Sequence, residues 1–220
     1  MNPAQVAEIA ALKRAALARL RPLIKESYTR ADELRAVRKD ENKAGELRTQ
    51  EREIIQGHPL DLFITPRDLA ARMVSLSDIW DGLTVLEPSA GTGRISEAIR
   101  EAGHNPVCVE LNWNAAKLLE QRGFNVTCTD FLEYTGNFDR VIMNPPFSKN
   151  QDVKHVRHAY DLLNEGGRLV AIMSAHSFFA QDRESKEFQD WLPGYGEELP
   201  AGSFKASGTM VNAYLVVIDK

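Results

Sequence analysis

The feature that most constrains the fold is a series of four short apolar runs, each followed closely by a polar side chain. The runs cover residues 83–86, 107–109, 124–128 and 141–143, and helical patterns separate them. Strands that alternate with helices predict a mostly parallel α/β sheet. In such a sheet the carboxyl ends of the strands lie along one edge and line the ligand crevice. We therefore expect the side chains at the four run ends, Glu87, Glu110, Asp130 and Asn144, to meet at one site.

The first run leads into a glycine turn, residues 87–93, with the sequence Glu-Pro-Ser-Ala-Gly-Thr-Gly. Gly91 and Gly93 let the backbone pass close to a ligand, and the helix that follows offers unpaired N–H groups. Glu110 comes seventeen residues after Gly93. That spacing is near the ~20-residue offset at which nucleotide-binding sheets place a carboxylate on ribose hydroxyls. The third glycine of the dinucleotide fingerprint is absent, with Glu97 and Ala98 in that region instead.

The fourth run ends in Asn144-Pro145-Pro146-Phe147. Two successive prolines cannot continue a strand, so they predict a rigid, extended corner. An amino group on a flat ring could donate to Asn144 Oδ1 and to the Pro145 carbonyl while the ring stacks on Phe147. The alternative is a plain proline-rich turn, which Asn-Pro commonly starts.

Together these motifs resemble the class I S-adenosylmethionine (AdoMet) methyltransferases, from about Leu62 to the C-terminus. Within that family the chain is similar to the amino-methyltransferases with an Asn-Pro-Pro-Phe/Tyr signature. Its glycine turn looks most like that of the DNA adenine-N6 enzymes of bacteria, phages and plasmids. The resemblance implies a Rossmann-like, seven-stranded, mostly parallel sheet with a C-terminal antiparallel hairpin.

The resemblance also implies roles for individual residues. Glu110 would bind the ribose hydroxyls of AdoMet, and Asp130 its adenine amino group, with Phe131 beside the ring. The full implied cofactor set is Thr65, Pro66, Glu87, Pro88, Ser89, Ala90, Gly91, Gly93, Glu110, Leu111, Asp130 and Phe131. The implied catalytic set is Asn144, Pro145, Pro146 and Phe147.

The implied reaction is methyl transfer to the N6 amine of adenine in DNA, with the base flipped out of the duplex. The alternatives are adenine in RNA, cytosine N4, a protein glutamine, or a non-catalytic partner subunit of the same fold. Asp152 and His155 follow the corner and are candidates for substrate contact. No metal site is expected, because His155, His158 and His176 lack a fourth ligand and the usual ligand spacing.

Residues 1–56 form a separate helical extension, and residues 57–220 form the catalytic domain. Apolar residues recur at three- and four-residue steps through the extension, with breaks expected at Pro22 and at the polar run 38–45. Residues 1–53 hold twelve Lys and Arg against nine Asp and Glu, whereas the remainder holds fifteen against twenty-two. Three interpretations remain open: a helical cap on the core, a dimer or partner helix, and a nucleic-acid arm. In the arm, phosphate contacts would come from Arg14, Arg21, Arg35, Arg38 and Lys39.

Several local features complete the prediction. Thr65 is expected as the N-cap of a helix with Pro66 at its first position. After the corner we expect a mobile loop at 148–151, a helix at 152–163, a strand at 168–173 and a short helix around 184–191.

Strands at 203–207 and 211–218, joined at Gly208, would form the hairpin. Cys108 and Cys128 are expected in buried strands, which fits a reducing cytoplasm. The longest apolar run, 169–173, is too short to span a bilayer.

Overall fold

The computed structural model describes residues 3–57, 64–205 and 211–220, and the predicted turn at Gly208 lies outside them. The chain divides into two compact units, Met1–Thr49 and Gln50–Lys220, which are described separately. Nowhere in the described ranges is a helix both long enough and apolar enough to cross a membrane.

Helix α1 (Pro3–Gly57) is a single α-helix that contains Pro22. The prediction that the polar run 38–45 interrupts it is wrong, and Pro22 does not divide it either. Five of the eight residues in the run are Arg, Lys, Glu or Ala, which favour the helix, and the largest single cost is that of Gly45, about 1 kcal/mol. Helix propensity therefore outweighs the lack of apolar residues in this segment.

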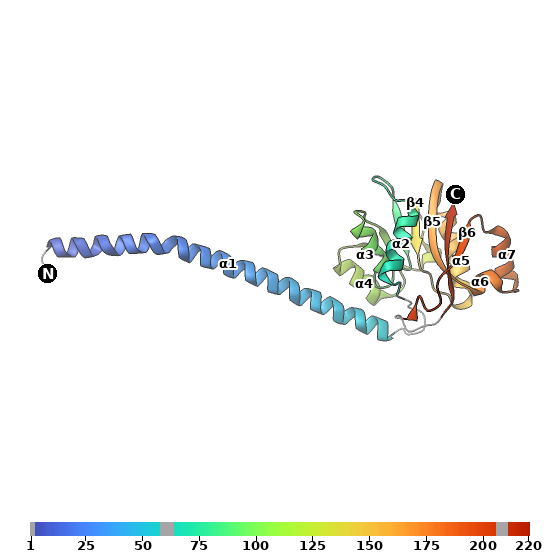
Figure 1. The fold of residues 1–220 in the computed structure, drawn as a ribbon, viewed down its shortest axis with the longest axis horizontal. Helices are drawn as coiled ribbons and strands as arrows, with labels where there is room; N and C mark the ends of the chain where they lie inside the picture. Colours follow the sequence, from blue (N-terminus) through green and yellow to red (C-terminus); the bar gives the residue numbers. More distant parts are fainter. Residues whose placement is uncertain (1–2, 58–63, 206–210) are drawn as a thin grey trace. The chain divides into compact units, whose positions relative to one another are not determined.

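The unit Gln50–Lys220 is built on a sheet in which seven strands are described, as predicted. In chain order the strands are β1 (Val85–Pro88), β2 (Val107–Glu110), β3 (Asn125–Cys128), β4 (Phe138–Met143), β5 (Leu163–Ser174), β6 (Tyr195–Glu198) and β7 (Ala213–Asp219). Their order across the sheet is β3-β2-β1-β4-β5-β7-β6. Figure 1 shows the ribbon, with β4, β5 and β6 labelled. Strands β1 to β5 run parallel, and β7 is antiparallel to both β5 and β6. The Rossmann-like α/β prediction with an antiparallel C-terminal end is confirmed.

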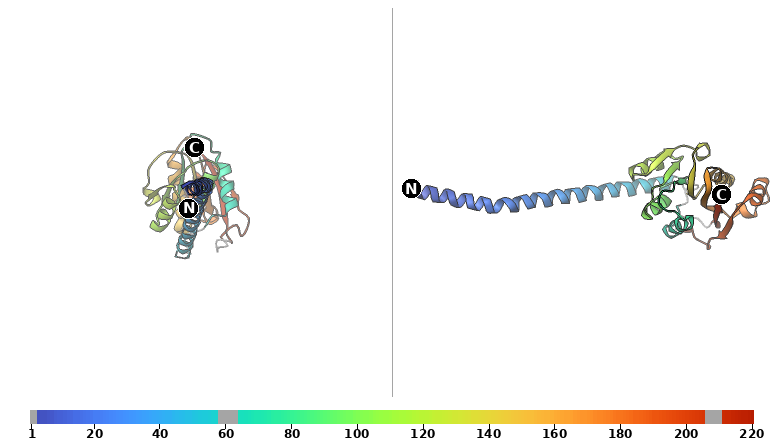
Figure 2. Two further views of the ribbon diagram at one scale, coloured as in Figure 1. Left: turned by 90° about the vertical axis from the view of Figure 1, so that its left-hand side faces the viewer. Right: turned by 90° about the horizontal axis from the view of Figure 1, so that it is seen from above.

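Both faces of the sheet are covered by helices, because alternate residues of each strand point to opposite faces. In β5, Leu169 and Met173 belong to one buried cluster with α5 and α7, whereas Val170 and Ile172 belong to another with α2 and α3. Figure 2 shows the ribbon from two further directions. The helices are α2 (Arg67–Ser77), α3 (Arg94–Glu101), α4 (Trp113–Gln121), α5 (Gln151–Asp161), α6 (His176–Phe179) and α7 (Arg183–Trp191), with 3₁₀ turns η1 (Phe131–Glu133) and η2 (Ser148–Asn150).

The C-terminal hairpin differs from the prediction. Its first strand is β6 (Tyr195–Glu198), whereas the described residues of the expected strand, 203–205, form a turn. Gly194 and Gly196 allow neighbouring groups to approach the backbone closely in this segment. A Cβ on Gly194 would lie 2.2 Å from Val217 O, and one on Gly196 would lie 3.2 Å from the Phe178 ring. The strand is polar because it lies at the edge of the sheet.

The structure differs from the sequence prediction at two further places. Cys108 is buried as predicted, but Cys128 is exposed, because β3 is the edge strand at the other end of the sheet. The segment expected as a loop at 148–151 forms η2 and the first residue of α5, with Lys149 and Asn150 both at a φ of 56°.

Asp152 connects the start of α5 to the end of β5. Its side chain is fully buried and accepts hydrogen bonds from Ser174 N at 2.9 Å and from Ser177 Oγ at 2.7 Å. Burial raises the pKa of this carboxyl group. Asp152 therefore fixes the carboxyl end of β5 against α5, and it is absent from the wall of the cavity described below.

Replacing Asp152 with Ala should lower the free energy of unfolding by about 2–4 kcal/mol, because two buried donors lose their acceptor. Urea unfolding measures this directly. The matched control is Asp161→Ala, a change of the same residue type at an exposed position of the same helix, which should cost less than about 0.5 kcal/mol. Equal losses in the two variants would contradict the structural role of Asp152.

Candidate active site

A cavity of about 630 Å³ opens at the carboxyl ends of β1, β2 and β4. The chain builds β1, β2 and β3 outward and then returns to place β4 on the other side of β1, so the cavity lies where the strand order reverses. Its volume is in the range of pockets that hold a cofactor-sized molecule. Of the residues predicted for the site, the wall contains Thr65, Glu87, Ser89, Ala90, Gly91, Glu110, Leu111, Asp130, Phe131, Asn144 and Pro146. Pro66, Pro88, Gly93, Pro145 and Phe147 are not in the wall.

Glu110 is held rigidly at the end of β2. Its Oε2 accepts from Gly91 N at 2.7 Å and its Oε1 accepts from Asn112 N at 2.7 Å. Only 7% of the residue is exposed. Each carboxylate oxygen can accept more than one hydrogen bond, so hydroxyl groups of a ligand fit beside these backbone donors.

Asp130 and Phe131 follow β3 and form another part of the wall. Asp130 Oδ1 accepts from Leu132 N at 2.9 Å, which starts the turn η1. The buried Phe131 ring lies 5.4 Å from the His155 ring and 4.9 Å from the His158 ring, measured between centroids. The wall of the cavity therefore contains an aromatic ring, that of Phe131, and a carboxylate, that of Asp130, as the sequence predicted.

The two glycines of the turn have different surroundings. Gly91 donates to Glu110 and lines the cavity, with a φ of 56°. Gly93 has a φ of 85°, and a Cβ there would lie 2.5 Å from Leu119 Cδ2. Gly93 is therefore required so that the turn can pack against α4.

His155 is brought into the site from α5. It is buried, lines the cavity, and its Nδ1 lies 3.2 Å from Ser89 Oγ. Burial lowers the pKa of His155 to about 4, so the imidazole is neutral at pH 7. Ser89 itself has a φ of 57°, a left-handed conformation that few side chains adopt, and the contact with His155 helps to fix it.

Asn144 is oriented by Thr65. Asn144 Nδ2 donates to Thr65 Oγ1 at 3.1 Å, and both residues line the cavity. The prediction of Thr65 as the N-cap of α2 is wrong, because the helix begins at Arg67 with Pro66 in the cap position. The Thr65 hydroxyl contacts the amide of the corner instead. Phe147 is half-buried, packed against the cluster that includes Ile142.

Residues 74–188, more than half of the chain, match the family model described as "Methyltransferase small domain". The chain belongs to this family.

Relatives of the methyltransferase include restriction–modification proteins. The chain is 24% identical over 166 residues to the type II restriction enzyme and methyltransferase RM.BcgI of Heyndrickxia coagulans, covering 59% of this chain and 26% of the relative. It resembles the EcoKI M protein of a type I restriction enzyme with a TM-score of 0.59 at 18% identity, covering 72% and 44% of the two chains. An RNA methyltransferase from Salinibacter ruber, solved with S-adenosyl-L-homocysteine, gives 0.51 at 17% identity, covering 71% and 92%. The chain thus spans about a quarter of the curated restriction enzyme.

The cofactor of the methyltransferase is AdoMet, in line with the class I fold. The cavity suits it, because Glu110 offers a fixed carboxylate for hydroxyl donors and Phe131 offers an apolar face within about 630 Å³. Among the residues whose placement is described, no group of three or more His, Cys, Asp or Glu could hold a metal ion.

Sequence reasoning missed several wall residues, which are Ile54, Ile64, Thr92, Arg94, Ile95, Val109, Asn112, Trp113, Thr129, Leu132 and Gln151. Asn112 could have been found, since it is an N-cap that accepts from Ala115 N at 3.0 Å. Trp113 had no signal in the sequence, although it is 68% exposed beside the cavity. Ile54 belongs to α1, where nothing in the sequence distinguishes it from other apolar helix residues.

Glu87 lies at the inner wall of the cavity and is almost completely buried. Its carboxyl group is hydrogen-bonded to the Ser96 hydroxyl, which also lies 3.0 Å from Cys108 Sγ. Burial raises the pKa of Glu87 from 4.5 to about 8, so the group is largely protonated at neutral pH. The methyltransferase therefore keeps an uncharged carboxyl group at the start of the glycine turn.

This pKa predicts a pH-dependent stability. A group whose pKa is higher in the folded state stabilises that state below pH 4.5 and loses this contribution as the pH rises to about 8. The loss for Glu87 is on the order of 4 kcal/mol. Urea unfolding at several values between pH 5 and pH 8 should show that Glu87→Gln becomes more stable relative to the unmodified protein as the pH rises. Glu101→Gln, at an exposed position of α3, should show no such trend, and parallel curves for all three proteins would contradict the prediction.

Proposed function

We propose that this protein transfers the methyl group of AdoMet to the N6 amine of adenine in DNA, with the base flipped out against the Asn144–Phe147 corner. The observation that carries the proposal is the orientation of Asn144. Its Nδ2 donates to Thr65 Oγ1, so Oδ1 is the end of the amide that can accept a hydrogen bond from a substrate. An exocyclic amine is a donor that matches this oxygen.

The chemistry of the corner follows from the weak nucleophilicity of such an amine, whose lone pair is delocalised into the ring. Donation of its two hydrogens to Asn144 Oδ1 and to the Pro145 carbonyl draws the nitrogen toward tetrahedral geometry and aims the lone pair. AdoMet supplies a sulfonium methyl group: the N–C bond forms, the C–S bond breaks with its electron pair staying on sulfur, and the nitrogen releases a proton to solvent. Positioning for in-line attack contributes most of the rate enhancement. The half-buried Phe147 would stack on the flipped base.

The cofactor would be held by the opposite wall. Glu110 would accept from both ribose hydroxyls, and Asp130 would accept from the adenine amino group with Phe131 beside the ring. The backbone of the glycine turn at residues 87–93 and the segment Thr65-Pro66 would contact the methionine part. Support comes from Glu110, Asp130 and Thr65, which line one cavity together with Asn144.

DNA is favoured as the acceptor by the kind of relatives. The restriction enzyme and methyltransferase RM.BcgI is similar to this chain in sequence, and the EcoKI M protein is similar to it in fold. RNA is the rival acceptor, because the Salinibacter ruber relative is an RNA methyltransferase. Transfer of tritiated methyl groups to plasmid DNA, total RNA and a protein extract, followed by nucleoside analysis, separates the two. N6-methyladenine confined to RNA would overturn the DNA assignment.

Two variants test the division of the cavity into a cofactor side and an acceptor side. Asn144→Ala should abolish methyl transfer and leave the AdoMet affinity nearly unchanged, because Asn144 faces the acceptor. Glu110→Ala should weaken AdoMet binding by about ten- to a hundred-fold, since charged hydrogen bonds contribute ~1.5–3 kcal/mol each. Calorimetry with AdoMet and single-turnover transfer assays measure the two effects. Near-normal transfer by Asn144→Ala, or unchanged AdoMet affinity in Glu110→Ala, would refute the respective assignment.

We further propose that the helical extension, residues 1–56, supplies phosphate contacts. The catalytic part of the chain carries an excess of acidic residues, so it needs a basic surface to approach DNA. Arg35, Arg38 and Lys39 are exposed on α1, and Arg35 is paired with Asp32 at 3.0 Å. The rival interpretation is that the extension packs against a second copy or a partner chain.

Replacing Arg35, Arg38 and Lys39 together with Gln should weaken DNA binding and flatten its salt dependence. The slope of log K against log salt should fall by about 2–3, at ~0.9 for each phosphate that the variant no longer neutralises. Fluorescence anisotropy on a duplex at several salt concentrations measures it. The control removes three exposed charges from the catalytic unit, in Lys117→Gln, Lys186→Gln and Lys205→Gln, and should change the slope less. Equal slopes for the two triple variants would exclude the arm.

A further inference from the structure

The last two turns of α1 belong to the catalytic unit. The unit begins at Gln50, and within it Ile54 is buried and lines the cavity beside Thr92 and Arg94. Glu51 lies three residues before Ile54, so both side chains project from the same face of the helix. This face meets the glycine turn.

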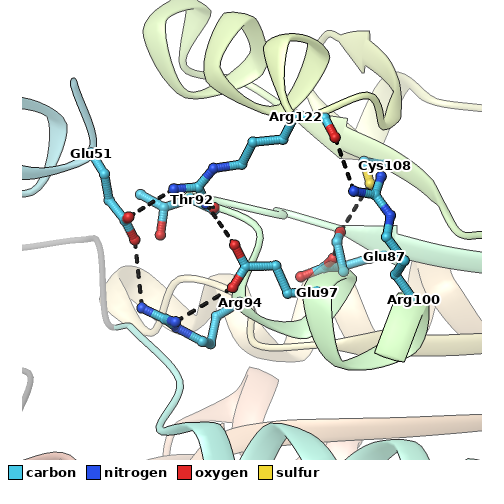
Figure 3. A network of polar contacts seen from close by, with 9 residues as sticks. Glu51, Glu87, Thr92, Arg94, Glu97, Arg100, Cys108 and Arg122 are labelled. Carbon is cyan, nitrogen blue, oxygen red and sulfur yellow. Dashed lines mark hydrogen bonds and ion pairs between the residues drawn. The ribbon is translucent and has the colours of Figure 1, made fainter. Parts of the chain in front are cut away.

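Glu51 joins a network of two carboxylates and two guanidinium groups (Figure 3). Its Oε2 lies 2.7 Å from Arg122 Nη2 and its Oε1 lies 3.5 Å from Arg94 Nη2. Glu97 completes the arrangement, 3.0 Å from Arg122 Nη1 and 3.4 Å from Arg94 Nη1. The side chains of Glu51 and Arg122 are only 17% and 13% exposed, so solvent screens this pair less than an ordinary surface ion pair.

Arg122 connects this network to the cofactor turn. Besides its two ion pairs, Arg122 Nη1 donates to Thr92 O at 2.6 Å, and Thr92 lies between Gly91 and Gly93. One guanidinium group at the end of α4 thus binds both the glycine turn and the end of α1. The cost of removing these charged groups from water offsets much of their mutual attraction. The network therefore adds little net stability, and its main effect is to fix the positions of the side chains.

We propose that residues 50–57 form a wall of the AdoMet site and that Glu51 is a positioning residue, which holds Ile54 against the bound cofactor. Ile54 excludes water from one side of the cavity, and Glu51 fixes where Ile54 lies by its bonds to Arg122 and Arg94. Glu51 itself does not line the cavity, so it acts on the cofactor through Ile54. The inference rests on the assignment of this cavity to AdoMet and is independent of the acceptor.

The test is a double-mutant cycle in the full-length protein, read out as the AdoMet dissociation constant by calorimetry. Glu51→Gln keeps the size of the side chain and should weaken binding by about three- to ten-fold, as expected for a partly shielded charged pair. Ile54→Ala should weaken binding to a similar or greater extent. In the double variant the loss should equal that of Ile54→Ala alone, because Glu51 has nothing left to position.

The matched control is Glu53→Gln, which makes the same change in charge at an exposed position of the same two turns and should leave the affinity unchanged. Thermal unfolding of each variant provides the readout for a purely structural role. A lower melting temperature with unchanged AdoMet affinity in Glu51→Gln overturns the proposal, and so does a double variant whose two losses simply add. Glu110→Ala serves as the reference: if it too leaves AdoMet binding unchanged, the cavity assignment itself is wrong. If it alone weakens binding, only the role of Glu51 is wrong.

Discussion

The carboxylate of Glu110 connects three elements that the rest of the site depends on. It accepts from Gly91 in the glycine turn and from Asn112 after β2, and Asn112 in turn caps α4. A buried carboxylate is costly unless donors surround it, so the turn and the start of α4 are fixed relative to β2 by the need to satisfy one side chain. The same residue that can bind ribose hydroxyls is therefore also the residue that shapes the turn.

A second set of polar contacts fixes the segments on either side of the Asn144 corner. Asp152 binds the end of β5 to α5, and Thr65 binds the amide of Asn144 just after β4. Both contacts lie at the carboxyl ends of adjacent parallel strands, where backbone groups lose their partners in the sheet. The side chains that make hydrogen bonds at these strand ends also fix the positions of the residues that line the cavity.

The sequence allowed prediction of the features that depend on local pattern. The alternation of strands and helices, the glycine turn and the meeting of Glu110, Asp130 and Asn144 follow from alternating apolar runs and from the geometry of parallel sheets. Features that depend on distant partners were not predictable. The first strand of the hairpin was expected at 203–207 and lies instead at β6, Cys128 was expected to be buried but lies on an edge strand, and Thr65 was expected as a cap but contacts Asn144. The role of Glu51 gave no signal, because its bonds to Arg94 and Arg122 join residues separated by some forty to seventy positions.

In the role proposed for it, the corner at Asn144 would select the chemistry of the acceptor and not the polymer that carries it. A carbonyl oxygen and a half-buried aromatic ring suit any planar amine, whether it belongs to adenine, cytosine or an amide. Discrimination between such acceptors must come from surfaces beyond the corner, because the hydrogen-bonded groups of the corner are the same for all of them. In a chain whose catalytic part is acidic, phosphate binding in particular requires a separate basic surface. Under the proposed function the exposed Arg and Lys residues of α1 would offer one, and the choice of polymer and the chemistry of transfer would then belong to different segments.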